Sequence, residues 1–576
     1  MNIGDERPDS GQRRPFDPFG EDEPVDYERV PLTPSEEPLS AGPAQEVFEP
    51  PETGKSGGSV ARSAAFFSIA TALSRIVGLG REILVAALFG IKGPMSAFTI
   101  AFQIPNLMRS LFADAALQTA FIPVFVSELE KGNRKEAFRL AMNAMLLLTI
   151  ATGLLTAIFV LAAPFLVPLF APGFKGELLT LTIILSQIMF PILILIGITS
   201  VIAGVLNSFH RFAAVAVAPI FWNLAIIATV LVLTPSLEGD DRIYAYAIGV
   251  VLGTIVQLAI PTWDLRHTPF RFSLPHLKEA LTSPDVRRVV VLMLPVMLTI
   301  GLLNFNLLVN SLFGTLVSDE GPAAIDKAFR LYILPQGLTV VALTVVLYPT
   351  LSRYASRGEM DKLRDTLGNG MRQAILLTLP AMAALLALSE PIVRLVYQRG
   401  EFDSAETVLV ASALFWLSLS LPFNGLLTMQ NRTFFSMQEP WLPAAFAALN
   451  LALTAGLAAA LYDPYGLPGI MFATAAASAI ATVLQSVVLR RRLRGLEVMK
   501  LLTVTARVLI ASALLAGVSW ETWHLLSTAL GTGLGAQIIS VGVALLAGGA
   551  LYIGAVLAMK VPEASQLLRV ARRIRD

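Results

Sequence analysis

Long apolar stretches constrain this chain more than any other feature of its sequence. Residues 141–170, 178–206 and 511–520 are dominated by apolar side chains, and short polar segments separate such stretches along the chain. A helix needs about 20 apolar residues to cross the hydrocarbon core of a bilayer. Only 15% of the residues are charged, whereas soluble domains carry about a quarter. The sequence therefore predicts a membrane protein.

The pattern within the stretches predicts the class of membrane fold. The alternating segments of about ten residues that mark a transmembrane barrel are missing, and lipid tolerates only helices or closed barrels. We therefore predict an all-α polytopic membrane protein with about 14 transmembrane helices. The predicted ranges are 62–90, 96–126, 136–163, 177–208, 213–234, 243–264, 287–316, 324–352, 366–397, 404–430, 441–461, 467–493, 502–526 and 533–559.

Basic residues divide the predicted loops into two sets. One set is rich in Lys and Arg, and it comprises the loops around residues 131–139, 211, 266–288, 353–364, 432, 490–494 and 569–575. The other set holds little beyond Lys92, Lys175, Arg242 and Arg399. Because Lys/Arg-rich short loops stay in the cytoplasm, we predict that both termini are cytoplasmic, which requires an even number of helices.

An internal repeat predicts two similar halves. The residues Pro123, Gly132, Asn143 and Met145 recur as Pro349, Gly358, Asn369 and Met371, at one offset of 226 residues. An offset of six helices preserves orientation, which is typical of parallel repeats around a central path. We predict two six-helix lobes plus two extra C-terminal helices.

The predicted domains follow from this division. They are a disordered cytoplasmic tail (1–57), an N-lobe (58–265), a C-lobe (285–495), a pair of helices forming a groove for a lipid tail (500–560) and a basic cytoplasmic tail (561–576). The first tail is rich in Pro, Glu, Asp, Ser and Gly and has too little apolar surface to fold.

Several classes of function lack the residues that they need. The chain has no cysteine and only four histidines, which stand singly, so metal or redox chemistry is not expected. No complete phosphate loop of the form Gly-x-x-x-x-Gly-Lys-Ser/Thr and no pairing of nucleophile and base is found. We therefore expect no ATP-driven transport, no enzymatic activity, no cofactor and no nucleic-acid partner.

Charged residues within the apolar segments indicate where a substrate passes. The first predicted helix contains Arg75, Arg81 and Glu82. A central arginine costs about 2.5 to 3.5 kcal/mol on insertion scales, so such residues normally face a protein interior or water. Gly78 and Gly80 stand between the arginines and would allow a bend that brings both to one face.

Two further predicted helices contribute polar faces. Gln103, Asn106, Arg109, Asp114 and Gln118 follow a spacing near 3.6 residues. Such spacing places them in one stripe on the second helix.

The eighth helix begins with Lys327 and Arg330 on one face. A cationic cavity between the lobes would suit an anionic, phosphate-bearing substrate, because guanidinium groups grip phosphate oxygens through paired hydrogen bonds. The alternative is that the arginines snorkel to the headgroups or pair with Glu82 and Asp114 only to hold helices together.

Several motifs together resemble one protein family. They are residues 74–82 (SRIVGLGRE), 101–109 (AFQIPNLMR), 112–116 (FADAA), 120–123 (AFIP), 329–335 (FRLYILP) and 397–402 (YQRGEF). These runs closely resemble the MurJ (MviN) family, the lipid II flippases of peptidoglycan synthesis.

The resemblance implies a fold, a substrate and a site. The fold would be that of the MATE-like (MOP) exporter superfamily, working by alternating access, and the partners would be lipid II and membrane lipids. The family's essential arginines would be Arg75, Arg81, Arg109 and Arg330, which would hold the diphosphate and sugar. Glu82, Gln103, Asn106 and Asp114 would complete the substrate site.

This chain departs from the family pattern at several positions. Ser96 and Phe329 stand where many members have acidic residues. Where a family member holds Na+ with carboxylates, this chain has Asn310 and Thr454, beside Asn450 and Thr474. Coupling to Na+ or to the membrane potential therefore stays open, since an inside-negative potential also pushes an anionic headgroup outward.

Three other functions stay open at this stage. A flippase for another polyprenyl-linked glycan would share the cationic cavity. A cation-coupled multidrug antiporter would need carboxylates there instead. A scaffold would recruit cell-wall synthesis proteins through the N-terminal tail, with Thr33 or Ser35 as phosphorylation sites.

Overall fold

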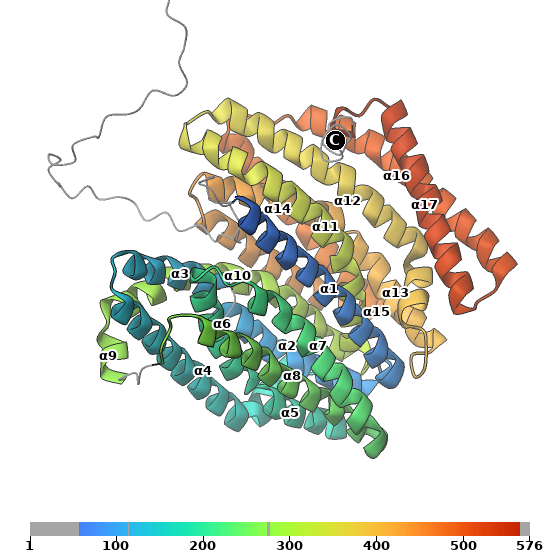
Figure 1. The fold of residues 1–576 in the computed structure, drawn as a ribbon. Helices are drawn as coiled ribbons and strands as arrows, with labels where there is room; N and C mark the ends of the chain where they lie inside the picture. The colour runs from blue at the N-terminus through green and yellow to red at the C-terminus, as the bar shows by residue number, and fades with distance from the viewer. Residues whose placement is uncertain (1–56, 113–114, 273–276, 565–576) are drawn as a thin grey trace, which may run out of the picture. The chain divides into compact units, whose positions relative to one another are not determined.

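The computed structural model describes residues 57–112, 115–272 and 277–564. Within these ranges every regular element is helical, as predicted (Figure 1). The predicted tail at residues 1–57, except Gly57 at the start of the first helix, lies outside the described residues, as do Thr33, Ser35 and most of the predicted basic tail at 561–576.

The first half of the chain supplies eight α-helices. They are α1 (Gly57–Phe89), α2 (Gly93–Phe112), α3 (Ala115–Glu130), α4 (Arg134–Phe170), α5 (Gly176–Met189), α6 (Ile192–Ser208), α7 (Ala213–Leu233) and α8 (Ile243–Asp264). The predicted helix at 177–208 corresponds to one candidate membrane span, Gly176–Ser208, which is divided into α5 and α6 at Phe190 and Pro191. Proline has no backbone N–H to donate to the preceding turn, which favours a break there.

The second half begins with the short α9 (Leu277–Thr282) and ends with two helices that lie side by side, drawn in red in Figure 1. The elements are α10 (Pro284–Val317), α11 (Gly321–Ser356), α12 (Met360–Tyr397), α13 (Ser404–Ser418), α14 (Leu421–Ser436), α15 (Trp441–Arg492), α16 (Val498–Leu530) and α17 (Leu534–Ala558). The predicted helix at 404–430 is a pair, α13 and α14, bent by 44°. The predicted helices at 441–461 and 467–493 are joined in α15 across a kink at Gly466, where φ is +60°.

Length and composition identify fewer candidate membrane spans among the described residues than the fourteen predicted helices. Among the described residues, eight helices are long and apolar enough to cross a bilayer, or nine if the bent pair α13 and α14 is one span. The helices α1, α2, α3, α10 and α11 are not among them. The chain is a multi-pass membrane protein, and the count of fourteen stays a prediction.

One turn recurs at the offset found in the sequence. Gly132 follows α3 and Gly358 follows α11, with φ of +78° and +68°. The bond from Asn133 N to Glu128 O has its counterpart from Glu359 N to Tyr354 O, both at 3.0 Å. Glycine adopts this left-handed conformation at little cost, so a glycine turns the chain after the helix in both halves.

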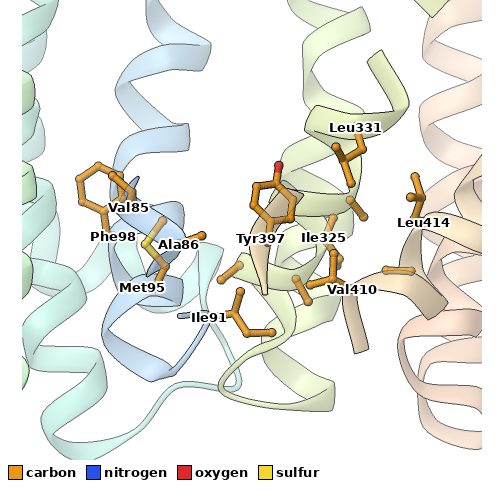
Figure 2. Packing of buried hydrophobic residues seen from close by; sticks show 14 of the residues in the cluster. Val85, Ala86, Ile91, Met95, Phe98, Ile325, Leu331, Tyr397, Val410 and Leu414 are labelled. Carbon is orange, nitrogen blue, oxygen red and sulfur yellow. The ribbon is translucent and has the colours of Figure 1, made fainter. Parts of the chain in front are cut away.

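Buried apolar residues join the two halves of the chain at one end of the helices. This is the end whose connecting loops contain few basic residues. Val85 and Phe98 from α1 and α2 belong to the same core as Ile325, Tyr397 and Val410 from α11, α12 and α13 (Figure 2). Within a bilayer, such packing is stabilised by van der Waals contact between helices and not by the removal of apolar surface from water. This shared core therefore fixes the first helix against the second half of the chain.

At the other end, each half has a core of its own. One core contains Phe121, Leu140 and Val205, and the other contains Leu363, Met371 and Val508. The start of α10 packs with the first of these two cores, although α10 follows the first eight helices in the chain. Apart from the start of α10, which packs with the core of the first half, the two halves therefore have separate cores at the basic-loop end.

Candidate functional site

Glu82 is the centre of a buried group of charges between α1 and α11. Its Oε2 accepts a hydrogen bond of 2.8 Å from Lys327 Nζ, and its Oε1 lies 3.1 Å from Arg330 Nη1. The neighbouring Arg81 also pairs with Oε1 through Nη2. One carboxylate from the first half thus faces cations from both halves.

A second carboxylate completes the group. Asp326 stands four residues before Arg330 on α11, and its Oδ2 accepts a hydrogen bond of 2.7 Å from Arg330 Nε. We call Arg81, Glu82, Asp326, Lys327 and Arg330 the charged cluster. With three cations and two carboxylates, the charged cluster carries a net charge of +1. Buried charges are tolerated when they are paired in this way.

Aromatic rings hold two of the cations. The guanidinium carbon of Arg81 lies 4.7 Å from the ring centroid of Trp222 on α7, and the Trp222 Nε1 donates to Thr254 Oγ1 at 3.3 Å. Lys327 Nζ lies 5.6 Å from the ring centroid of Tyr397 on α12. A cation over an aromatic face is attracted by the ring quadrupole. The rings therefore fix the cations where water is largely excluded.

Arg75 does not join the charged cluster. α1 runs as one helix through Gly78 and Gly80, so the bend that would bring Arg75 and Arg81 to one face is absent from it. Residues six apart on a regular helix point in different directions. Arg75 is exposed and has no ion pair or hydrogen bond with the described residues.

The polar stripe of α2 has hydrogen bonds of its own. Asn106 Oδ1 accepts a hydrogen bond of 3.0 Å from Arg109 Nε. Gln103 is buried, and its amide has no hydrogen-bond partner among the described residues. Asp114 lies outside the described residues. Gln103 thus offers a donor and an acceptor that no neighbouring side chain uses.

The structure adds residues that sequence reasoning did not place in the site. Asp326 was overlooked, although its spacing of four from Arg330 is that of an ion pair on a helix. Lys327 was recognised as basic but not as the partner of Glu82. Trp222 and Tyr397 carry no local signal, because their roles depend on how α7 and α12 pack.

The two departures from the family pattern have defined contacts. Ser96 is buried, and its Oγ accepts a hydrogen bond of 3.2 Å from the backbone N–H of Ala323 at the start of α11. Phe329 stacks with Tyr332, with ring centroids 5.9 Å apart. Asp326 supplies Arg330 with a carboxylate from one turn earlier in the helix.

The residues considered for Na+ form a neutral cluster between α10 and α15. Thr474 Oγ1 donates to Asn310 Oδ1 at 3.1 Å, and Asn450 Oδ1 accepts from Asn306 Nδ2 at 3.2 Å. Thr454 is buried with its hydroxyl unpaired among the described residues. The set contains no carboxylate, and two of its oxygens already accept hydrogen bonds. It does not fit a site that holds a cation by charge.

Comparisons with known proteins agree on one family. The family described as "Lipid II flippase MurJ" matches residues 85–540. The "Probable lipid II flippase MurJ" of Rhizobium meliloti (strain 1021) is 35% identical over 480 residues, which cover 80% of this chain and 87% of the relative. The "Lipid II flippase MurJ" of Burkholderia cenocepacia is 30% identical over 389 residues, or 67% of this chain and 75% of the relative.

Solved structures support the same fold. A structure described as "Lipid II flippase MurJ, inward closed conformation" matches with a TM-score of 0.69 and 21% identity, covering 86% of this chain and 99% of that chain. An inward-facing MATE family transporter of the MOP superfamily matches with a TM-score of 0.61 and 17% identity, covering 75% and 98%. At these identities the likeness concerns the fold alone.

Proposed function

Because the chain belongs to the lipid II flippase MurJ family, we propose that it carries lipid II from the cytoplasmic to the outer leaflet of the bacterial plasma membrane. The observation that carries this proposal is the sharing of one carboxylate, Glu82, by Arg81 and Arg330. The protein moves its substrate by alternating access and makes no covalent change in it.

The charged cluster has the chemistry that a lipid diphosphate requires. Arginine stays ionised at every physiological pH and binds phosphate through two parallel hydrogen bonds. A diphosphate that reaches Arg81 and Arg330 replaces Glu82 as the hydrogen-bond acceptor of both guanidinium groups. One anionic partner thus replaces another, so the arginines are not left unpaired within the membrane. The excess of cations over carboxylates favours this exchange.

Other predicted residues surround this anchor. Arg75 and Arg109 provide further positive charge on α1 and α2, and Asn106 orients Arg109. Gln103 provides an unused amide for a sugar hydroxyl. Asp114 remains a proposed member of the substrate site.

The packing of the two halves supports a state that receives lipid from the cytoplasm. The halves share a core at one end and, apart from the start of α10, have separate cores at the end with the basic loops. Loops rich in Lys and Arg face the cytoplasm. Both termini are then cytoplasmic, and the halves separate more easily on the cytoplasmic side.

The membrane potential is the proposed driving force, in place of Na+. An inside-negative potential contributes about 2.3 kcal/mol per elementary charge per 100 mV and moves an anion outward. The neutral cluster around Asn310 and Thr454 supports this choice, since it offers no carboxylate. Flipping would be measured in vesicles with an imposed potential and no sodium gradient, and a rate that ignored the potential would rule the mechanism out.

The other functions are less well supported. A multidrug antiporter needs a carboxylate for its cationic substrate, whereas Glu82 and Asp326 already face cations. A flippase for another polyprenyl-linked glycan shares the arginine chemistry, and competition between distinct lipid-linked sugars would separate it from the proposed one.

Complementation tests the proposed function. The chain is expressed in a bacterium conditionally depleted of its own MurJ, alongside Arg75→Ala, Arg81→Ala, Arg109→Ala and Arg330→Ala variants. Arg357→Ala, an exposed arginine in the turn after α11, is the control. We expect the parent and the control to rescue growth and the four variants to fail at equal membrane expression. Rescue by all variants would make the arginines structural, and a well-expressed parent that does not rescue would favour another glycan.

A further inference from the structure

Lys327 is the most deeply buried charge in the described part of the protein. Its side chain has 0% exposure, and Glu82 Oε2 is its ion-pair partner at 2.8 Å. Lysine is rarely buried to this degree unless it is paired. Solubility does not explain a charge at this position, because the side chain does not reach solvent.

The two oxygens of Glu82 have separate partners. Oε2 belongs to Lys327, while Arg81 and Arg330 both approach Oε1. Arg330 is 32% exposed and has Asp326 as a second partner, so it is accessible to a ligand without losing every contact. The two arginines therefore share Oε1, while Lys327 pairs with Oε2.

Substrate binding would leave Glu82 without a partner if Lys327 were absent. Arg81 and Arg330 must turn toward the diphosphate, and an unpaired carboxylate in a site of low dielectric is costly. Lys327 stays beneath Glu82 and cannot reach solvent, so it continues to neutralise the carboxylate during this exchange.

We propose that Lys327 is a positioning residue for substrate binding, which neutralises Glu82 and thereby leaves Arg81 and Arg330 available to a lipid diphosphate. This inference rests on the proposed function. It assigns no contact between Lys327 and the substrate. By neutralising Glu82, Lys327 determines how strongly this carboxylate competes with the substrate for Arg81 and Arg330.

The charge of the variants distinguishes this role from a structural one. Lys327→Met lowers the net charge of the charged cluster from +1 to 0 and leaves both arginines to Glu82. Adding Glu82→Gln restores +1 and removes the competitor. Because removing both members of a buried ion pair can also restore stability, binding is compared with thermal unfolding for each variant. A structural role predicts that both fall in Lys327→Met and recover together, whereas the positioning role predicts a loss of binding at an unchanged unfolding midpoint.

Binding is measured with the full chain in lipid nanodiscs, using purified lipid II and undecaprenyl diphosphate as probes. Lys327→Met is compared with the Lys327→Met/Glu82→Gln pair, and Lys131→Met, an exposed lysine in the turn after α3, is the matched control. We expect Lys327→Met to weaken binding by about tenfold or more, as for the loss of charge-assisted hydrogen bonds. The double variant should return to within about threefold of the parent, and the control should not differ from it.

Each remaining outcome has a defined meaning. Parent-like binding by Lys327→Met, or no recovery in the double variant, overturns the inference while the proposed function stands. A parent that binds neither probe overturns the proposed function and the inference together. Thermal unfolding of each variant checks folding, and if Lys327→Met does not fold, Lys327→Gln, which keeps a donor for Glu82 but no charge, provides the same comparison.

Discussion

The backbone N–H of Glu401 donates a hydrogen bond of 2.8 Å to the carbonyl oxygen of Ala87. The loop after α12 therefore lies directly against the last turn of α1, at the end of the molecule where the two halves share a core. Opening of this end requires the contact to break, so its strength contributes to the balance between conformations.

Gly400 makes this close approach possible. Its φ is +63°, and a Cβ atom there would lie 2.2 Å from the Ala87 oxygen. We expect Gly400→Ala to destabilise the protein by roughly 1–3 kcal/mol from overpacking, in addition to about 1–2 kcal/mol of backbone strain. Gly358→Ala has a similar φ of +68° with no atom within 4 Å, so it should show the strain alone. Equal shifts in the thermal unfolding midpoint would contradict this account.

Glu406 strengthens the same contact from α13. Its Oε1 accepts a hydrogen bond of 3.1 Å from the buried backbone N–H of Ile91. Glu406→Ala leaves that N–H without an acceptor, which costs about 1–3 kcal/mol. Glu406→Gln keeps an oxygen acceptor and should lose less.

Glu401→Gln is the control for this prediction. It removes an exposed pair with Lys92, and such pairs contribute about 1 kcal/mol or less. Denaturation of the three variants in detergent would measure the difference. A larger effect of Glu401→Gln than of Glu406→Ala would refute the assignment.

The sequence predicts the positions of the helices better than the contacts between them. Apolar length and the position of proline and glycine are local properties, and the range predicted at 243–264 matches α8. The partnership of Glu82 with Lys327 joins residues far apart in the chain, so no local pattern contains it. The same reason explains why Arg75 was expected beside Arg81: two glycines permit a bend, but packing against α7 decides whether it forms.

Trp222 should affect substrate binding through Arg81. The centroid of its ring lies 4.7 Å from the guanidinium carbon, and such an interaction contributes about 2 kcal/mol or more where water is excluded. We expect Trp222→Leu to weaken lipid II binding by about tenfold and Trp222→Phe to weaken it less. Thr254→Val removes only the acceptor of the indole N–H and is the control. Parent-like binding by Trp222→Leu would show that Arg81 is held by Glu82 alone.

Acid should loosen the attachment of the last two helices. Arg372 of α12 binds Glu497, just before α16, at 2.7 Å, and it also binds Glu563, after α17. A hydrogen bond from Lys500, opposed by partial burial and supported by Arg372, lowers the pKa of Glu497 below its ordinary value of 4.5. A carboxyl with a lowered pKa stabilises the fold above its unfolded pKa, and this contribution is lost as the pH falls through the folded value.

We therefore expect the thermal unfolding midpoint to fall as the pH is lowered below about 4.5. Glu497→Gln should have a lower midpoint at pH 7 and a smaller fall in acid, because its amide does not titrate. Glu439→Gln removes a carboxylate that pairs with Arg492 at the end of α15, and it is the control for the midpoint at pH 7. If Glu497→Gln and the parent lost stability equally in acid, other carboxyls would be responsible, and the bond between Glu497 and Arg372 would not determine how firmly α16 is held.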